Sequence, residues 1–319
     1  MQLHAASIGE AVPRENFDAL IQSVFDSAVN LRLADEDRLI TVLISDHYEL
    51  PQGIRLATKN LSLQSLAVGH QAVSRGGMLR FDSSPLSIDL RGAHIWRCRV
   101  RDLNTDMSFP TIQKAWSTAL NFLTKGQRLK STEIIADDLF QIGTGSALSQ
   151  RMSKPVMQLI KSAQQFEVQG SAQVAEKMIG LGPGVTPSGD DILIGFLAGL
   201  WSMAGQHDKQ LSFVRLFGNE IIKLAKQTSE ISRTYLYHAA QGQFSSSLSM
   251  LAEAIATHGD VEQATQEAMR VGHSSGMDSV TGLLVGLSVW NNLALAAVSK
   301  MPLSGTRRGR RFESPKEVT

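Results

Sequence analysis

The chain has few of the residues on which several classes of protein depend. Cys98 is its one cysteine in 319 residues, which excludes an intrachain disulfide framework and any cysteine-rich metal site. Lysine and arginine number 31 against 30 aspartates and glutamates, and the net charge of +1 gives no electrostatic argument for nucleic acid or an anionic membrane surface. Charged residues make up only 19% and hydrophobic residues 43%, so the chain can bury a large core.

No hydrophobic run is suited to crossing a bilayer. The run at 192–205 is shorter than the ~20 residues that a membrane helix needs. The run at 280–298 is nearly long enough, but it carries a serine and two asparagines and begins beside Asp278. The N-terminus lacks the basic segment and apolar core of a signal peptide. We therefore expect a cytoplasmic protein that binds neither membrane nor nucleic acid.

The common signatures of catalysis and nucleotide binding are also missing. There is no H-E-x-x-H zinc motif, no Walker A lysine after the glycine-rich loop, and no G-x-G-x-x-G after a strand. Any chemistry must therefore rest on hydroxyls, carboxylates, main-chain amides and histidine.

What the chain does have is a glycine- and proline-rich stretch at 180–191, which reads GLGPGVTPSGDD and leads directly into an apolar helical pattern. Gly182 and Gly184 can adopt backbone angles closed to other residues and let a ligand approach the main chain. Ser188 is a good N-cap, and Asp191 three residues later completes a pattern like a capping box. The free N–H groups and the helix dipole at such a start favour an anion.

The same helix start occurs a second time. Residues 188–200 and 275–287 both fit the pattern S-G-x-D-x-x-x-G-x-x-x-G-L. Glycines spaced four apart give each helix a smooth strip along which a second backbone can come close. We predict two equivalent helices, related by a pseudo-twofold axis and packed through their glycine faces. Such a pair would bring Asp191 and Asp278 to one cleft.

Two interpretations of the repeated motif remain open. In the first, each Ser and Asp caps its own helix and the glycines only permit packing. In the second, the two helix starts share a ligand. The second predicts His273, Asp191 and Asp278 as catalytic residues. It predicts as substrate-binding residues Gly182, Gly184, Thr186, Ser188, Gly189, Asp190, Thr228, Ser232, Ser274, Ser275 and Gly276.

The charges in this predicted site limit its ligand. An aspartate that points into an anion site is unfavourable unless a cation or a donor from the ligand lies between them. This indicates either an amide-bearing substrate or Mg2+, for which Asp190, Asp191 and Asp278 are the predicted ligands. His273 is a general acid–base or only a neighbour of the helix cap.

Hydrophobic periodicity divides the chain into two parts. Short alternating segments between glycines and prolines predict strands at 30–34, 39–44, 54–57, 78–81, 86–90 and 94–100. From residue 111 the period becomes helical. We predict an α+β protein with a barrel- or sandwich-like β-rich domain at 1–105 and a mostly helical domain carrying the site at 106–301. A basic tail without apolar periodicity, 302–319, is predicted to be disordered.

Three arginines and the cysteine lie in the last predicted strand or directly after it. Arg97, Arg99 and Arg101 alternate and would line one face, as a solvated surface or as a site for an anion or a partner. Cys98 is expected to be an ordinary buried thiol.

The two motifs together resemble a known bacterial family. The stretch at 180–191, with GHSSGMD at 272–278, is similar to the AllH-like family, whose member in anaerobic allantoin and purine catabolism is a subunit of oxamate carbamoyltransferase. The resemblance covers the helical part well and the β-rich part only in general layout. It implies carbamoyl transfer between oxalurate plus phosphate and oxamate plus carbamoyl phosphate, together with FdrA-like and AllG-like subunits. The alternatives are a non-catalytic scaffold or regulatory subunit, and a Mg2+-dependent phosphate-handling hydrolase.

Overall fold

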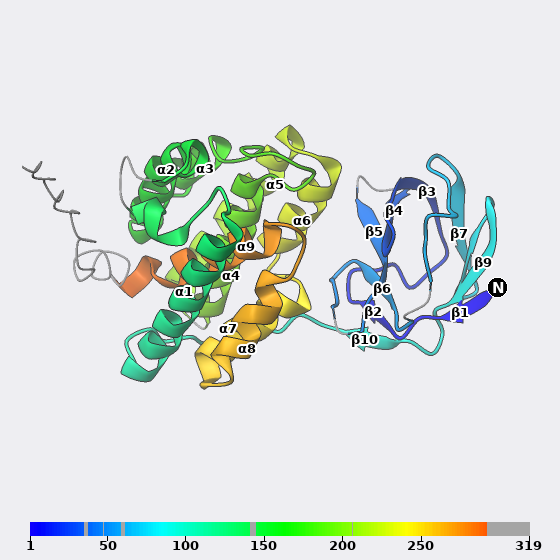
Figure 1. Cartoon of the computed structure of the whole chain (residues 1–319), viewed down its shortest axis with the longest axis horizontal. Helices are drawn as coiled ribbons and strands as arrows, with labels where there is room; N and C mark the ends of the chain where they lie inside the picture. Colours follow the sequence, from blue (N-terminus) through cyan, green and yellow to red (C-terminus); the bar gives the residue numbers. More distant parts are fainter. Residues whose placement is uncertain (35–37, 47, 59–60, 141–144, 206, 292–319) are drawn as a thin grey trace, which may run out of the picture.

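The computed structural model describes residues 1–34, 38–46, 48–58, 61–140, 145–205 and 207–291. A curled sheet from the N-terminal part lies beside a bundle of helices from the remainder (Figure 1). The predicted α+β organisation is therefore confirmed. The tail at 302–319, including its arginines, lies outside the described residues.

The sheet is mixed and bends into a half-barrel around its own core. Its strands are β1 (Gln2–His4), β2 (Ser7–Gly9), β3 (Phe17–Val24), β4 (Ala28–Leu33), β5 (Leu39–Ile44), β6 (Gly53–Leu56), β7 (Gln71–Arg75), β8 (Met78–Phe81), β9 (Ser84–Asp89) and β10 (His94–Trp96). Their order is β1-β9-β8-β7-β3-β4-β5-β6-β2-β10. Along β3, Phe17, Ala19 and Ile21 are buried while Asp18 and Leu20 are exposed, as expected of a strand with one face on a core.

The predicted strand at 94–100 is wrong in its second half. β10 ends at Trp96, and residues Val100–Asp102 form a short 3-10 helix, η1. Cys98 and Val100 leave the sheet here and pack into the core of the helical part. Arg97, Arg99 and Arg101 are exposed, so they alternate with buried residues in an irregular segment rather than along a strand face. The prediction of a buried thiol is confirmed, and burial raises the pKa of Cys98.

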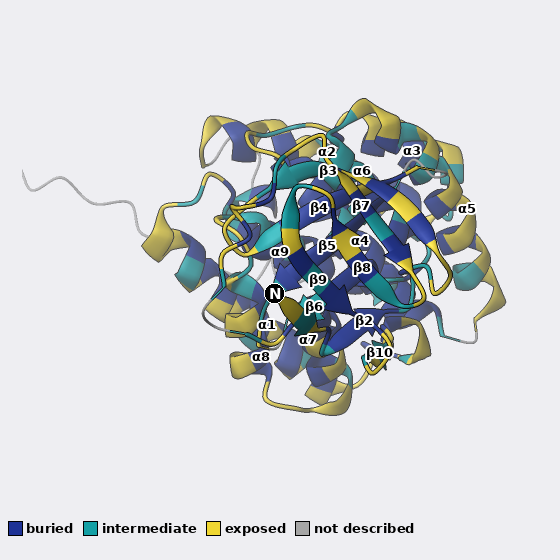
Figure 2. Ribbon diagram, turned by 90° about the vertical axis from the view of Figure 1, so that its right-hand side faces the viewer, coloured by how far each residue is buried: buried dark blue, intermediate teal, exposed yellow. Residues whose placement is uncertain are grey.

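The helical part surrounds one central helix. Its helices are α1 (Pro110–Lys130), α2 (Ala147–Gln164), α3 (Val168–Glu176), α4 (Ser188–Ala204), α5 (Asp208–Leu224), α6 (Glu230–Ala240), α7 (Ser246–Thr257), α8 (Val261–Met269) and α9 (Ser275–Leu287), with 3-10 turns η2 (Ala136–Phe140), η3 (Ala225–Gln227) and η4 (Val289–Asn291). Every residue of α4 except Ile194 is buried. Figure 2 shows exposed residues on the outer faces of α3 and α5. Within the described chain, no helix has the length and hydrophobicity to span a bilayer.

Helices α4 and α9 pack against each other through their glycines (Figure 1). A Cβ atom on Gly195 would collide with the carbonyl oxygen of Ser279, and a Cβ atom on Gly282 with that of Ile192. Gly199 and Gly286 face the other helix in the same reciprocal way. Early positions meet early positions and late meet late, so the helices run in the same direction with both N-termini at one end. This is the arrangement that the repeated motif predicts.

The sheet and the bundle have separate cores but are joined by hydrogen bonds. The sheet core runs from Ala5 to Leu90, and the helical core from Cys98 to Val289. Between them, the Glu49 amide donates to Ser246 Oγ and the Ser246 amide to the Glu49 carbonyl oxygen, both at 2.9 Å. Glu230 at the start of α6 accepts a 2.6 Å bond from Arg32 of β4. These contacts fix the two parts around the space described next.

Candidate functional site

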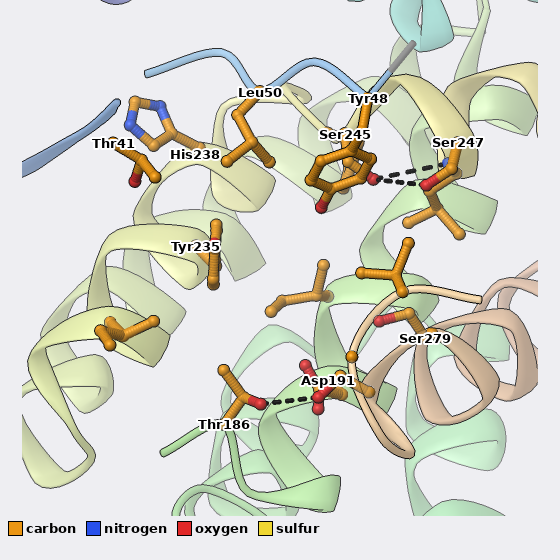
Figure 3. Close-up of a pocket in the computed structure, with 18 of the residues that line it drawn as sticks. Thr41, Tyr48, Leu50, Thr186, Asp191, Tyr235, His238, Ser245, Ser247 and Ser279 are labelled. Atoms are coloured by element: carbon orange, nitrogen blue, oxygen red, sulfur yellow. Dashed lines mark hydrogen bonds between the residues drawn. The ribbon is translucent and has the colours of Figure 1, made fainter. Parts of the chain in front are cut away.

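A cavity of about 270 Å³ lies between the sheet and the helical bundle (Figure 3). The sheet side supplies β4, β5 and the β5–β6 connection, and the helical side supplies the glycine-rich loop, α6, α7 and the starts of α4 and α9. Its polar lining residues are Asn30, Thr41, Tyr48, Gln52, Thr186, Asp191, Tyr235, His238, Gln243, Ser245, Ser247, Ser275 and Ser279. Between these the wall is apolar, with residues such as Leu50, Ile194 and Phe244.

Asp191 is the buried acid of this cavity. It lies in the first turn of α4 and is 4% exposed, and its Oδ2 atom has no hydrogen-bond partner in the described chain. Burial raises its pKa well above the usual range, and the charge of Asp278 raises it further. The hydroxyls of Ser275 and Thr186, which share a 2.6 Å hydrogen bond, lower the pKa only in part. Asp191 is therefore an acid that the fold favours in its neutral form.

Asp278 occupies the equivalent position in α9 but does not line the cavity. It is 1% exposed, and neither carboxylate oxygen has a hydrogen-bond partner among the described residues. Burial raises its pKa to about 7. The hydroxyls of Ser188 and Ser274 are close enough to lower that pKa, although neither has the geometry of a hydrogen bond. The two carboxyl groups thus lie near each other, as predicted, but only Asp191 reaches the cavity.

The serines of the repeated motif do not cap their own helices. The N-cap position of α4 is Pro187, because Ser188 is already the first helical residue, and that of α9 is Ser274. Neither helix start has a side-chain capping hydrogen bond, so the predicted capping box is wrong. Instead Ser275 lies beside Asp191 and Ser188 beside Asp278, each reaching across to the other helix. This exchange between motifs explains why both copies carry the same serine and aspartate.

Asp190 and its neighbours hold the glycine-rich loop in place. The carboxylate of Asp190 is completely buried and accepts from the Gly180 amide at 2.8 Å and from Thr228 Oγ1 at 2.5 Å. Ser229 is the N-cap of α6 and accepts from the Ser232 amide at 3.1 Å. Thr228 thus contacts Asp190, and Ser232 contacts the N-cap of α6, and neither residue lines the cavity.

The structure brings some of the predicted site residues to the cavity and leaves others outside. Those that line it are Thr186, Asp191, Ser275 and Gly276. Those that do not are His273, Gly182, Gly184, Ser188, Gly189, Asp190, Thr228, Ser232, Ser274 and Asp278. His273 is exposed in the turn before α9. The roles assigned to these residues stay predictions.

The predicted glycines meet different demands. Gly182 and Gly184 have positive φ angles of 120° and 92°, which explains the choice of glycine there. A Cβ atom on Gly189 or Gly276 would collide with a main-chain carbonyl oxygen, of Met178 and Ala268 respectively, so these two glycines allow close packing.

Three cavity residues were not singled out by the sequence patterns. Tyr48 and Tyr235 are phenols whose pKa values burial raises, for Tyr235 to about 12. Burial lowers the pKa of His238 to about 4, and its Nδ1 lies 2.9 Å from Gln243 Oε1. All three side chains are uncharged at neutral pH. The one local signal was that Tyr235 and His238 are three residues apart on α6 and so share a face.

The cavity wall carries hydroxyls, amides and one carboxyl group but, in its described residues, no lysine or arginine. The described chain also has no group of three His, Cys, Asp or Glu residues placed to hold a metal ion. No such group of ligands in the described chain supports the predicted Mg2+ site, which stays a prediction. A wall of this kind suits an uncharged or weakly charged ligand with hydrogen-bonding groups.

Comparison with known proteins places both sides of the cavity in one family. Residues 178–287 match a family model described as oxamate carbamoyltransferase subunit AllH, and residues 4–95 match the AllH family N-terminal domain. The first match contains Asp191, Tyr235 and both glycine helices, and the second contains Tyr48. No solved structure matches the chain. Because the two matches cover most of the sequence, this chain belongs to the AllH family.

Proposed function

We propose that this chain is the substrate-binding subunit of an oxamate carbamoyltransferase. In this proposal the cavity between sheet and bundle holds the carbamoyl-bearing substrate, and FdrA-like and AllG-like subunits supply the rest of the enzyme. The proposal depends on the buried carboxyl group of Asp191, whose Oδ2 has no partner in the described chain and which faces a cavity lined by hydroxyls and amides.

A neutral carboxyl group is well matched to a primary amide. Its O–H donates to the amide carbonyl oxygen while its own C=O accepts from the amide N–H. Oδ2 of Asp191 has no partner within the described protein, and such a buried polar atom costs about 1–3 kcal/mol until a partner arrives. The carbamoyl group of oxamate or oxalurate is such a partner. Thr186 and Ser275 provide further hydroxyls beside it.

The same cavity discriminates against a highly charged ligand. With no lysine or arginine in its described wall, a phosphate dianion would have to be desolvated without a counter-charge. A single carboxylate is more tolerable, because burial favours the neutral form of Asp191 and the N-termini of α4 and α9 lie at the same end of the pair. We therefore expect oxamate to bind this chain more tightly than inorganic phosphate.

The first prediction concerns Asp191. Replacing it by alanine is expected to weaken oxamate binding about tenfold or more, because the buried amide of the ligand would lose its partner, at a cost of about 1–3 kcal/mol. Asp278→Asn is the matched control, since Asp278 has the same place in the other motif but does not line the cavity. It is expected to keep the affinity within about threefold of the wild type. Calorimetric titration of the full chain, with and without Mg2+, measures both.

Other outcomes would favour the alternatives. If the wild-type chain binds no oxamate with or without Mg2+, it is a scaffold or regulatory subunit. Phosphate binding that requires Mg2+ would support the hydrolase. Equal losses in both variants would show one site shared by the two helix starts, and the cavity account would then be wrong.

A further inference from the structure

Two phenol side chains, one from each part of the chain, line the cavity. Tyr48 belongs to the β5–β6 connection of the sheet part, and Tyr235 to α6 of the helical part. Ser245 is the polar neighbour of the Tyr48 hydroxyl and lowers the pKa of that phenol, while burial raises the pKa values of both phenols. Both residues line the space.

The two phenols face the same space as Asp191. In Figure 3, Tyr48 extends into the cavity from the sheet side and Tyr235 belongs to α6. Asp191 and Thr186 lie on the opposite side of the cavity from Tyr48. All three residues line this one cavity of about 270 Å³. One small molecule can therefore reach all three.

The chemistry of the two sides is complementary. Asp191 is suited to an amide, whereas a phenol that keeps its proton is an O–H donor for an oxyanion. Hydrogen bonds from neutral hydroxyls to an ionised acceptor are short and strong, so they can hold a carboxylate without a cation. A planar monoanion fits this better than phosphate, whose second charge would remain unpaired.

We propose that Tyr48 and Tyr235 form an oxyanion subsite that binds the carboxylate end of the substrate, while Asp191 binds its amide end. This inference rests on the proposed function. The site would be incomplete without the N-terminal sheet, because the sheet part supplies Tyr48 and the helical part supplies Tyr235.

The test uses two ligands that differ in one group. Oxamate has an amide and a carboxylate, whereas oxamide has an amide in place of the carboxylate. Tyr48→Phe and Tyr235→Phe remove only a hydroxyl and are expected to weaken oxamate about tenfold or more, with less than a threefold change for oxamide. Tyr237→Phe is the matched control on the same helix, because Tyr237 does not line the cavity and its ring lies 5.0 Å from the Arg38 guanidinium. It is expected to change neither affinity.

The inference is overturned if both cavity variants weaken the two ligands equally, or if they weaken neither. If Asp191→Ala still weakens oxamate binding about tenfold or more in that case, the proposed function stands and only the oxyanion subsite is wrong. If the wild type binds neither ligand, both fall together. Thermal melts check that each variant is folded. If Tyr48→Phe does not fold, the affinities of Tyr235→Phe alone decide the test.

Discussion

Gly195→Ala and Gly282→Ala are each expected to lower the free energy of unfolding by roughly 3 kcal/mol or more, or to prevent folding. In both cases the new methyl group would occupy the position of a main-chain carbonyl oxygen of the other helix. Main-chain atoms cannot rotate aside as a side chain can, so α4 and α9 would have to separate along the centre of the core. The better helix propensity of alanine, worth about 1 kcal/mol, offsets only part of this. Urea denaturation followed by circular dichroism measures the change.

Gly92→Ala is the control for these two variants. Gly92 lies between β9 and β10 and is not in the left-handed region, and a Cβ atom on it would meet no neighbouring atom within 4 Å. Its replacement is expected to change stability by less than about 0.5 kcal/mol. A Gly195→Ala protein as stable as the Gly92→Ala protein would show that the two glycine helices are not in direct contact.

The second large effect is expected for Asp278→Asn, which should stabilise the protein at alkaline pH. The folded-state pKa of Asp278 is about 7, above the ordinary value of 3.8, so the native state holds this proton more tightly than the unfolded chain. As pH rises from about 4 to 7 the unfolded chain releases the proton first, and stability falls. The full cost, roughly 4 kcal/mol, is present at pH 8 and absent at pH 3. Asparagine cannot ionise and avoids it.

Denaturation at several pH values tests this difference. The gain from Asp278→Asn is expected to grow between pH 4 and pH 7 and then to level off. Asp208→Asn is the control, because Asp208 also lies in the first turn of a helix but is exposed. It should show no such gain. A stability profile of Asp278→Asn parallel to that of the wild type would mean that Asp278 is not buried as a neutral acid.

The central helix pair can be predicted from the sequence because the signal lies within two short segments of the chain. Glycines four residues apart define a smooth face, and the repetition of the whole pattern in 188–200 and 275–287 indicated that the two faces meet. The capping-box prediction for Ser188 is wrong because the pattern does not show where the helix begins. Ser188 is already the first residue of α4, so its hydroxyl does not cap the helix and lies beside Asp278 of the other helix.

The cavity could not be predicted, because it depends on how the sheet packs onto the bundle. Tyr48 lies in an irregular connection and Tyr235 within an ordinary amphipathic helix, and no periodicity links them. His273 adjoins the second motif in sequence, but it is exposed in the turn before α9 and does not line the cavity. The strand predicted at 94–100 is too long for a related reason. Alternation of buried and exposed residues has the same pattern whether the buried residues enter the sheet core or the helical core.

An amide-bearing substrate is expected to bind between the sheet and the bundle, against Asp191. A crystal structure of the full chain soaked with oxamate would show whether it does. We expect electron density for one oxamate in the cavity, with its amide on Asp191 and its carboxylate toward Tyr48 and Tyr235. Oxamate bound beside Asp278 and outside the cavity, or a cavity that stays empty at saturating oxamate, would contradict it.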